Sequence, residues 1–167
     1  EAVAAELRAA GCRGAAIEAD LTENSQAQNA VQQAIQQFGR IHVLVNNAGW
    51  DRVEPFMENT PETWEKIINI NFKAQLFVSR ALLPHLIEHG GGRIVNIASD
   101  AGRVGSMGEA VYSGMKGAVI AFSKSLAREM ARYKINVNVV CPGLTETPLM
   151  EEIRGTSEWS SRVMESI

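Results

Sequence analysis

The chain has 167 residues, of which 46% are apolar and 21% are charged, as in an ordinary single globular domain. Its 16 basic and 19 acidic residues give a formal net charge of −3, which disfavours binding to nucleic acid. Two cysteines cannot build a disulfide framework, and no apolar run is long enough to cross a bilayer. We therefore expect a protein of the reducing cytoplasm, with no nucleic-acid or membrane partner.

Apolar periodicity and stop signals predict alternating helices and strands in the first part of the chain. Gly11 and Gly39 each follow a helical pattern and supply a helix stop, while the Thr22 hydroxyl supplies a helix cap. The predicted elements are a helix at 1–10, a strand at 15–19, a helix from 22 to 38 and a strand at 41–45.

The same alternation continues to the end of the clear patterns. Thr60 and Pro61 form a strong helix start, and three glycines at 90–92 break the pattern that follows. The predicted elements are a helix from 60 to 89, a strand at 93–98, a helix at 111–132 and a strand at 135–141.

The four predicted strands are apolar throughout, which is typical of strands buried on both faces. Helices of 15 or more residues between strands indicate crossover connections and a parallel sheet. The fold class is therefore α/β, a doubly wound, Rossmann-type parallel sheet in one domain over 1–167. Such sheets normally have six or more strands, so we expect the domain to be incomplete at both ends.

The strongest chemical signal combines Ser99, Tyr112 and Lys116. Ser99 follows the end of a predicted strand, where ligands of open parallel sheets bind. Tyr112 and Lys116 are four residues apart near a helix start and share one face of that helix. A nearby ammonium favours the phenolate, so we expect Lys116 to lower the pKa of Tyr112 and to make it an acid or base.

Other residues with ligand-binding chemistry fall at the same edge of the sheet. Asn46, Asn47, Ala48 and Gly49 follow the second strand, where small residues allow a close backbone approach to a ligand. Asparagine is disfavoured inside a helix, yet Asn71 lies in one. The turn after the fourth strand contains Pro142, Gly143, Thr145 and Thr147.

The chain contains six motifs in a fixed order: A-D-L (19–21), N-N-A-G (46–49), N (71), S (99), Y-x-x-x-K (112–116) and P-G-x-x-x-T (142–147). In these motifs and in their order it resembles a short-chain dehydrogenase/reductase. The resemblance implies an NAD(P)-dependent oxidoreductase, with NAD the expected cofactor and NADP the alternative. It implies that Tyr112 is the acid or base, that Lys116 lowers its pKa and binds ribose, that Ser99 orients the substrate oxygen, and that Asn71 maintains a proton relay. Implied cofactor contacts are Asp20, Leu21, Asn46, Ala48, Gly49, Tyr112, Lys116, Pro142, Gly143, Thr145 and Thr147. The family's glycine-rich T-G-x-x-x-G-x-G segment is absent, so we expect a chain that lacks the N-terminal glycine-rich βα unit and the C-terminal strand.

Three stretches carry a narrower resemblance, at 50–56, 99–106 and 127–133. They resemble 2-hydroxycyclohexanecarboxyl-CoA dehydrogenases and, next, 3-oxoacyl-acyl-carrier-protein reductases. The substrate implied is a secondary alcohol or ketone, as an alicyclic or 3-hydroxyacyl-CoA thioester. Trp50 and Ser99 are candidate substrate contacts, and Arg103, with Arg52, is a candidate for the phosphates of an acyl-CoA.

The sequence raises three further hypotheses. The chain is a catalytically inactive fragment or a non-catalytic binding subunit if its cofactor site is lost. His85 and His89 match an inverted zinc-protease pattern, but histidines at a helix end are explained by the helix dipole, and we predict no metal site. The apolar faces of 76–87 and 119–130 exceed what one sheet face needs, which favours a homodimer or homotetramer.

Overall fold

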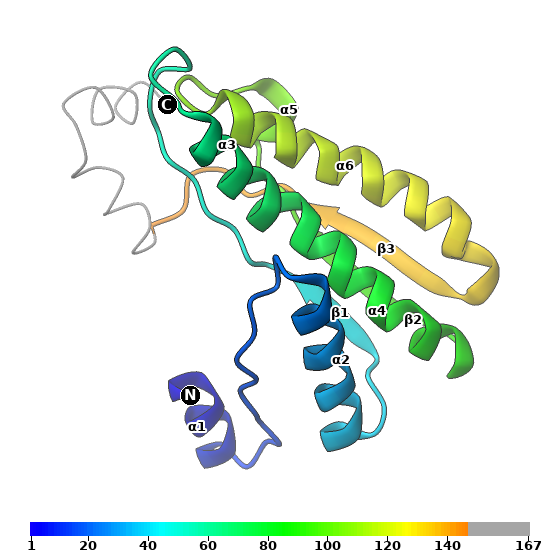
Figure 1. The fold of residues 1–167 in the computed structure, drawn as a ribbon. Coiled ribbons are helices and arrows are strands. Elements are labelled where there is room, and N and C mark those ends of the chain that lie inside the picture. Colours follow the sequence, from blue (N-terminus) through cyan, green and yellow to red (C-terminus); the bar gives the residue numbers. More distant parts are fainter. Residues whose placement is uncertain (147–167) are drawn as a thin grey trace.

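The computed structural model describes residues 1–146, which fold as a parallel β-sheet and a layer of helices (Figure 1). Among these residues, no helix is long and apolar enough to span a membrane. In chain order the elements are α1 (Ala2–Ala9), α2 (Asn24–Phe38), β1 (Val43–Asn46), α3 (Pro61–Ile68), a π-helical turn (Asn69–Lys73), α4 (Ala74–Glu88), β2 (Gly92–Ile97), α5 (Ala101–Val104), α6 (Ala110–Met130), a 3-10 turn (Ala131–Tyr133) and β3 (Ile135–Val140).

The three strands are parallel and lie in the order β1-β2-β3, which confirms the predicted Rossmann-type α/β class. The register pairs Leu44 with Ile94 and Ile94 with Val137, so these side chains share one face of the sheet. Helices α2, α4 and α6 cover that face (Figure 1). On the other face, Val43 and Val45 are 47% and 54% exposed, so the predicted burial of both faces is not found in residues 1–146.

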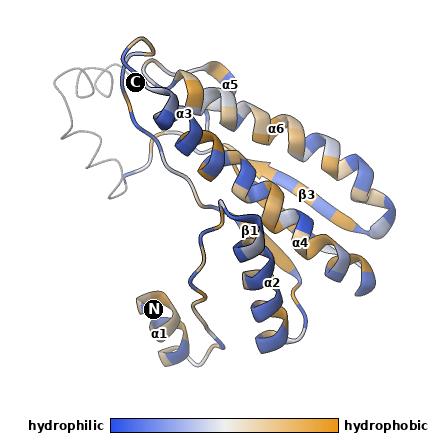
Figure 2. Ribbon diagram, viewed as in Figure 1, coloured by the Kyte–Doolittle hydropathy of each residue, from blue (hydrophilic) through white to orange (hydrophobic). Residues whose placement is uncertain are grey.

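The hydrophobic core lies between the sheet and its helical layer. Its buried members come from α4, β2, α6 and β3, and Figure 2 shows hydrophobic residues along α4, α6 and β3. The buried members are Leu82, Leu86, Ile94, Leu126, Ile135 and Val137. This packing holds the carboxyl ends of the strands in a fixed relation to the start of α6.

A buried polar network crosses the same layer. The Asn46 Nδ2 atom donates to Ser79 Oγ at 3.0 Å and to Asn96 Oδ1 at 2.8 Å. The Asn96 Nδ2 atom donates to Ser123 Oγ at 2.9 Å, and this hydroxyl donates to the Val119 carbonyl at 2.7 Å. The network therefore links α4, β1, β2 and α6 through direct hydrogen bonds between side chains.

Two local predictions in the first part of the chain are wrong. The segment 15–19 is not a strand, because it has no hydrogen-bonded neighbour strand among the described residues. Thr22 does not cap α2: its hydroxyl donates to Asp20 Oδ1 at 2.6 Å, and the helix begins after Glu23. The predicted stop is confirmed, since Gly39 has φ 79° and its N–H donates to the Ile35 carbonyl.

The helix predicted from 60 to 89 is present but not uniform. Thr60 caps it, accepting a hydrogen bond from the Thr63 N–H at 3.3 Å. One π-helical turn around Asn71 separates α3 from α4. Such single turns are frequent at functional sites, because the extra residue redirects one side chain.

Candidate active site

Ser99, Tyr112 and Lys116 meet where β2 ends and α6 begins. Ser99 lies two residues beyond the end of β2, and its Oγ accepts a hydrogen bond from the Ala101 N–H at 3.2 Å. The Lys116 Nζ atom donates to the Ile97 carbonyl at 3.0 Å and lies 5.4 Å from the centre of the Tyr112 ring. The three side chains thus occupy one site at the carboxyl edge of the sheet.

Asn71 joins this site from the π-helical turn. It is fully buried, and its Nδ2 atom donates to the carbonyls of Trp50 at 2.6 Å and Ile67 at 3.0 Å. Its Oδ1 atom accepts from the Trp50 N–H at 3.3 Å. Asn71 therefore fixes the backbone that follows the N-N-A-G turn.

Gly49 lies between Asn71 and Lys116. A Cβ atom at this position would be 3.2 Å from Asn71 Oδ1 and 3.5 Å from Lys116 Nζ. A side chain here would crowd Asn71 and touch Lys116. Glycine at this position therefore allows the N-N-A-G turn to pack closely against both groups; its expected contact with the cofactor stays a prediction.

Burial shifts the pKa values of the two ionisable groups toward their neutral forms. Burial raises the pKa of Tyr112 to about 12; a hydrogen bond with Ser99 opposes the shift, and the charges of Asp51 and Glu109 add to it. Burial lowers the pKa of Lys116 to about 8, and the charge of Asp51 opposes this shift. The expected lowering of the Tyr112 pKa is therefore wrong, because desolvation of the phenol raises the pKa more than the hydrogen bond with Ser99 lowers it.

Four of the implied cofactor contacts, Asp20, Leu21, Asn46 and Ala48, divide between two hollows. Leu21, Asn46 and Ala48 line a cavity of about 320 Å³ between α2, β1 and α4. Asp20 lies in a separate groove with the start of α3. A hydrogen bond from the Thr22 hydroxyl, and a second from its N–H, lower the pKa of Asp20, so this carboxylate is ionised at neutral pH.

The turn after β3 lies beside the cluster of Ser99, Tyr112 and Lys116. The Pro142 carbonyl accepts a hydrogen bond from the Asp100 N–H at 2.8 Å, next to Ser99. Gly143 follows, and its carbonyl accepts from the exposed Thr145 hydroxyl at 3.1 Å. Thr147, also expected to contact the cofactor, lies outside the described residues.

Trp50, Arg103 and Arg52 are the candidate substrate side chains outside the cluster, and each contacts a different partner. The Trp50 ring is covered by the Lys66 ammonium, which lies 3.8 Å from the ring centre. Arg103 forms an exposed ion pair with Asp100 at 2.9 Å. Neither of these two contacts places Trp50 or Arg103 against Tyr112.

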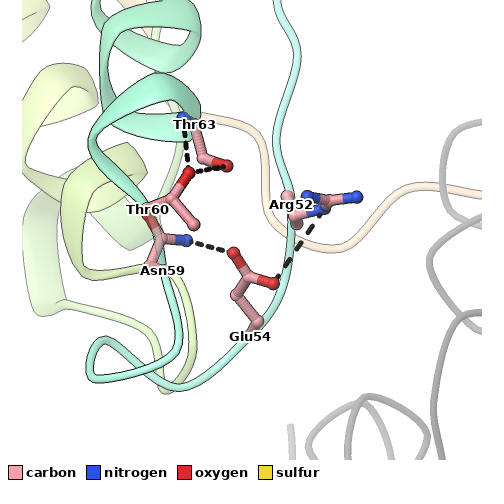
Figure 3. A network of polar contacts seen from close by, with 5 residues as sticks. All are labelled: Arg52, Glu54, Asn59, Thr60 and Thr63. Atoms are coloured by element: carbon pink, nitrogen blue, oxygen red, sulfur yellow. Dashed lines mark hydrogen bonds and ion pairs between the residues drawn. The ribbon is translucent and has the colours of Figure 1, made fainter.

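Arg52 belongs to a polar network in the loop after β1 (Figure 3). Its Nε atom lies 4.0 Å from Glu54 Oε2, and the other oxygen of Glu54 accepts from Asn59 Nδ2 at 2.8 Å. The network fixes the loop just before the Thr60 cap of α3.

His85 has a structural partner. Its Nε2 atom accepts a hydrogen bond from the Ile41 N–H at 3.1 Å, and burial lowers its pKa. The His89 Nδ1 atom is 2.9 Å from the His85 carbonyl. His85 thus holds the approach to β1 as a neutral acceptor.

Sequence reasoning missed Asp51, Glu109 and Gly102. Asp51 is 5% exposed, and burial together with Glu109 raises its pKa to about 8. Its place directly after N-N-A-G-W, at the ligand edge, was the available signal. Glu109 is the residue before α6, three positions ahead of Tyr112, and that spacing was its signal.

Gly102 fixes the close packing of α5 on α6. A Cβ atom at this position would lie 2.6 Å from the backbone carbon of Lys116 and 2.7 Å from the Gly117 nitrogen. Gly102→Ala must therefore push α5 away from α6. We expect a loss of about 1–3 kcal/mol in the free energy of unfolding, measured by urea denaturation.

Gly114 provides the matched control for this change. It lies on α6 with nothing within 4 Å of an added Cβ atom. Gly114→Ala should raise the free energy of unfolding by about 0.5–1 kcal/mol, because alanine is the better helix former. Equal effects of the two substitutions would contradict the close-packing role of Gly102.

Comparison with known proteins places these features in a family. The model of the short chain dehydrogenase family matches residues 1–158. The acetoacetyl-CoA reductase of Acinetobacter sp. (strain RA3849) is 43% identical over 135 residues, covering 81% of this chain and 54% of that protein. The 3-oxoacyl-acyl-carrier-protein reductase of Thermotoga maritima is 37% identical over 134 residues, which cover 80% of this chain and 54% of that protein.

A solved structure agrees with these relatives. The 3-ketoacyl-(acyl-carrier-protein) reductase from Brucella melitensis, crystallised with NADH, superimposes with a TM-score of 0.77 at 33% identity, covering 80% of this chain and 57% of that one. This chain spans about half the length of the curated relatives it matches. The predicted resemblance to this family, and to its 3-oxoacyl reductases, is confirmed. The chain belongs to the short-chain dehydrogenase family.

Proposed function

We propose that the protein is an NAD(P)-dependent oxidoreductase that interconverts a ketone and a secondary alcohol. The observation that carries this proposal is the meeting of Ser99, Tyr112 and Lys116 at the carboxyl edge of the sheet. A parallel sheet of this type binds its ligands at that edge. Gly49 supports the proposal, because its lack of a side chain lets the N-N-A-G turn lie close to Asn71 and Lys116.

The nicotinamide cofactor supplies or accepts the hydride when it is bound. The residues to hold it are those of the N-N-A-G turn, Lys116 and the Pro142–Thr145 turn, with Asp20 and Leu21 on the adenosine side. Ser99 donates a hydrogen bond to the substrate oxygen and orients it toward Tyr112. Tyr112 gives its phenolic proton to that oxygen during reduction and takes it back during oxidation. Asn71 holds the Trp50 backbone beside this path and supports a water-mediated proton relay.

Reduction is the direction that the protonation state favours at neutral pH. With a pKa of about 12, the Tyr112 hydroxyl keeps its proton and is ready to act as an acid. Oxidation requires the phenolate and is expected to be faster at alkaline pH.

We further propose an acyl thioester carrying a 3-oxo or 3-hydroxy group as the substrate class. The names of the Acinetobacter and Thermotoga relatives support this class, since both act on such acyl groups. An alicyclic hydroxyacyl-CoA remains a second substrate to assay. Trp50, beside the N-N-A-G turn, and Arg103, exposed on α5, are the proposed substrate contacts outside the cluster.

We also propose a homo-oligomer, either a dimer or a tetramer, in the cytoplasm. Its support is the apolar character of α4 and α6, where Ile87 is 37% exposed. Sedimentation equilibrium gives the mass directly, and a monomer at all concentrations would exclude this part of the proposal.

Titration with NADH and with NADPH tests the cofactor, with nicotinamide fluorescence as the signal. We expect saturable binding of NADH, weakened by Lys116→Met. Lys124, also on α6, provides the control, because Lys124→Met keeps the cluster intact. Failure of both dinucleotides to bind would favour the alternative, a non-catalytic chain of the same fold.

A further inference from the structure

Asp51 is a buried carboxyl group whose hydrogen-bonding capacity is not met. It is 5% exposed, and neither of its oxygens makes a well-formed hydrogen bond among the described residues; the Arg52 N–H lowers the pKa of Asp51, but burial and Glu109 outweigh this effect. An ionised carboxylate accepts hydrogen bonds only, and burying one without donors or a bound cation is costly. Such a group normally holds a proton instead.

The neighbour of Asp51 is another carboxyl group. Asp51, Glu109 and Tyr112 line one small hollow, and the Glu109 side chain is within hydrogen-bonding reach of Asp51. Two carboxylates cannot donate to each other, so a hydrogen bond between them requires a shared proton. Asp51 and Glu109 therefore satisfy each other only when one of them is protonated.

The backbone holds this pair together. The Glu54 N–H donates to the Gly108 carbonyl at 3.1 Å, and the Glu109 N–H donates to the Ser106 carbonyl at 3.2 Å. The Glu54 side chain is anchored by Asn59 (Figure 3). The Glu54–Gly108 bond thus ties the loop after β1 to the loop before α6, and the other two bonds brace each loop internally.

The nearby cations do not replace the proton. Arg52 is 58% exposed, and its guanidinium pairs with Glu54 instead of Asp51. The charge of buried Lys116 lowers the pKa of Asp51, but less than burial and Glu109 raise it, and its Nζ atom donates to the Ile97 carbonyl and not to Asp51. Tyr112 is the remaining titratable group of the hollow, and both carboxyl groups make its ionisation harder.

We propose that Asp51 and Glu109 share one proton at neutral pH and act as a positioning pair that keeps Tyr112 protonated. The proposal rests on the proposed function, since it assigns the pair a role toward the acid of that reaction. The pair carries one negative charge when it holds the shared proton and two when it does not. This negative charge opposes formation of the Tyr112 phenolate. Loss of the shared proton at alkaline pH strengthens this opposition, so the pair biases the site toward reduction.

Carbon-13 NMR of the aspartate carboxyl groups tests the shared proton without any activity. The chain has three aspartates, at 20, 51 and 100, so specific labelling gives three signals, assigned by Asp→Asn substitutions. We expect the Asp51 signal to titrate far above the acid range in which Asp20 titrates. Glu109→Gln should move the Asp51 midpoint to lower pH. An acid-range midpoint for Asp51, or one that Glu109→Gln leaves in place, overturns the pair.

Stability gives a second readout of the same proton. Between the ordinary aspartate pKa of 3.8 and about 8, the folded protein holds a proton that the unfolded chain releases. The free energy of unfolding therefore decreases as pH rises through this range. Asp51→Asn should reduce this decrease, and Asp100→Asn, which changes an exposed carboxylate, should leave it unchanged. The same slope in Asp51→Asn and in the unmodified protein counts against the proposal.

Tyrosinate absorbance tests the role toward Tyr112. The chain has two tyrosines, so a Tyr133→Phe background leaves Tyr112 as the only signal. In that background Asp51→Asn should move the tyrosinate transition to lower pH, and the pH optimum of alcohol oxidation should follow it. An unchanged transition overturns the positioning role even where the NMR result supports the shared proton. Absence of turnover in the unmodified protein would instead contradict the proposed function and leave both spectroscopic results valid.

Discussion

Tyr112→Phe is expected to lower kcat by about 10²- to 10⁴-fold, the usual contribution of a positioned acid or base. The substitution removes one oxygen and keeps the ring that packs at the start of α6. The phenol is the group that carries a transferable proton beside Ser99, whose hydroxyl is suited to orient the substrate oxygen. Steady-state rates of ketone reduction, with the cofactor consumed as the signal, provide the measurement.

Tyr133→Phe is the matched control. Tyr133 lies in the 3-10 turn after α6, packs against the core and has Arg132 over its ring at 4.6 Å. It is therefore remote from the cluster at the start of α6, and its hydroxyl has no part in the proposed reaction. We expect kcat within about twofold of the unmodified protein. Comparable losses in the two variants, or near-normal turnover in Tyr112→Phe, would exclude Tyr112 as the acid.

Cofactor affinity separates chemistry from binding in this experiment. Lys116 and the N-N-A-G turn remain intact in Tyr112→Phe, so the Kd for NADH should change little. A large rise in Kd would assign Tyr112 a binding role and weaken the interpretation of the rate loss.

Sequence patterns predicted the place of the site because strand ends and helix starts are local signals. A parallel sheet brings the carboxyl ends of its strands to one edge, so residues after β1, β2 and β3 had to meet there. Ser99 and Lys116 came together as that rule requires. Thr60 and Gly39 also behaved as predicted, because capping and positive φ are decided within a few residues.

The electrostatics of the site could not be predicted in the same way. The spacing of Tyr112 and Lys116 indicates proximity, but the pKa of each depends on how much water the fold removes. Burial raised the pKa of Tyr112 and lowered the pKa of Lys116, whereas the sequence predicted that the pKa of Tyr112 would be lowered. Asp51 was missed for the same reason, since an aspartate after a strand gives no sign that it is buried beside Glu109.

Prediction from the sequence was also limited by strand pairing, which depends on segments far apart in the chain. The segment 15–19 has the composition of a strand, but a strand exists only with a hydrogen-bonded neighbour. Apolar composition likewise predicted burial on both faces, whereas Val45 is exposed because α2, α4 and α6 cover the opposite face. The π-helical turn at Asn71 inserts one residue into a pattern that remains helical on either side, so periodicity could not locate it.

Asn96→Leu is expected to lower the free energy of unfolding by about 2–4 kcal/mol. Asn96 is fully buried and stands in the middle of the polar network, accepting from Asn46 and donating to Ser123. Leucine has a similar size but can neither accept nor donate a hydrogen bond, so one Asn46 N–H loses its buried acceptor. Urea denaturation followed by circular dichroism measures the loss.

Asn138→Leu makes the same chemical change on the opposite face. Asn138 pairs with Val95 in the register of β2 and β3 and is exposed. We expect a change within about 0.5 kcal/mol, because its amide remains solvated in the unmodified protein. A loss for Asn96→Leu no larger than this control would contradict a stabilising role for the network.

The network also connects stability to the site. Asn46 begins the N-N-A-G turn, and its amide is held by Ser79 on α4 as well as by Asn96 on β2. In Asn96→Leu the Ser79 bond remains, so Gly49 should stay near Lys116 in molecules that are still folded. Turnover per folded molecule should then fall much less in Asn96→Leu than in Tyr112→Phe. The two variants thus separate residues that hold the sheet together from the residue that moves the proton.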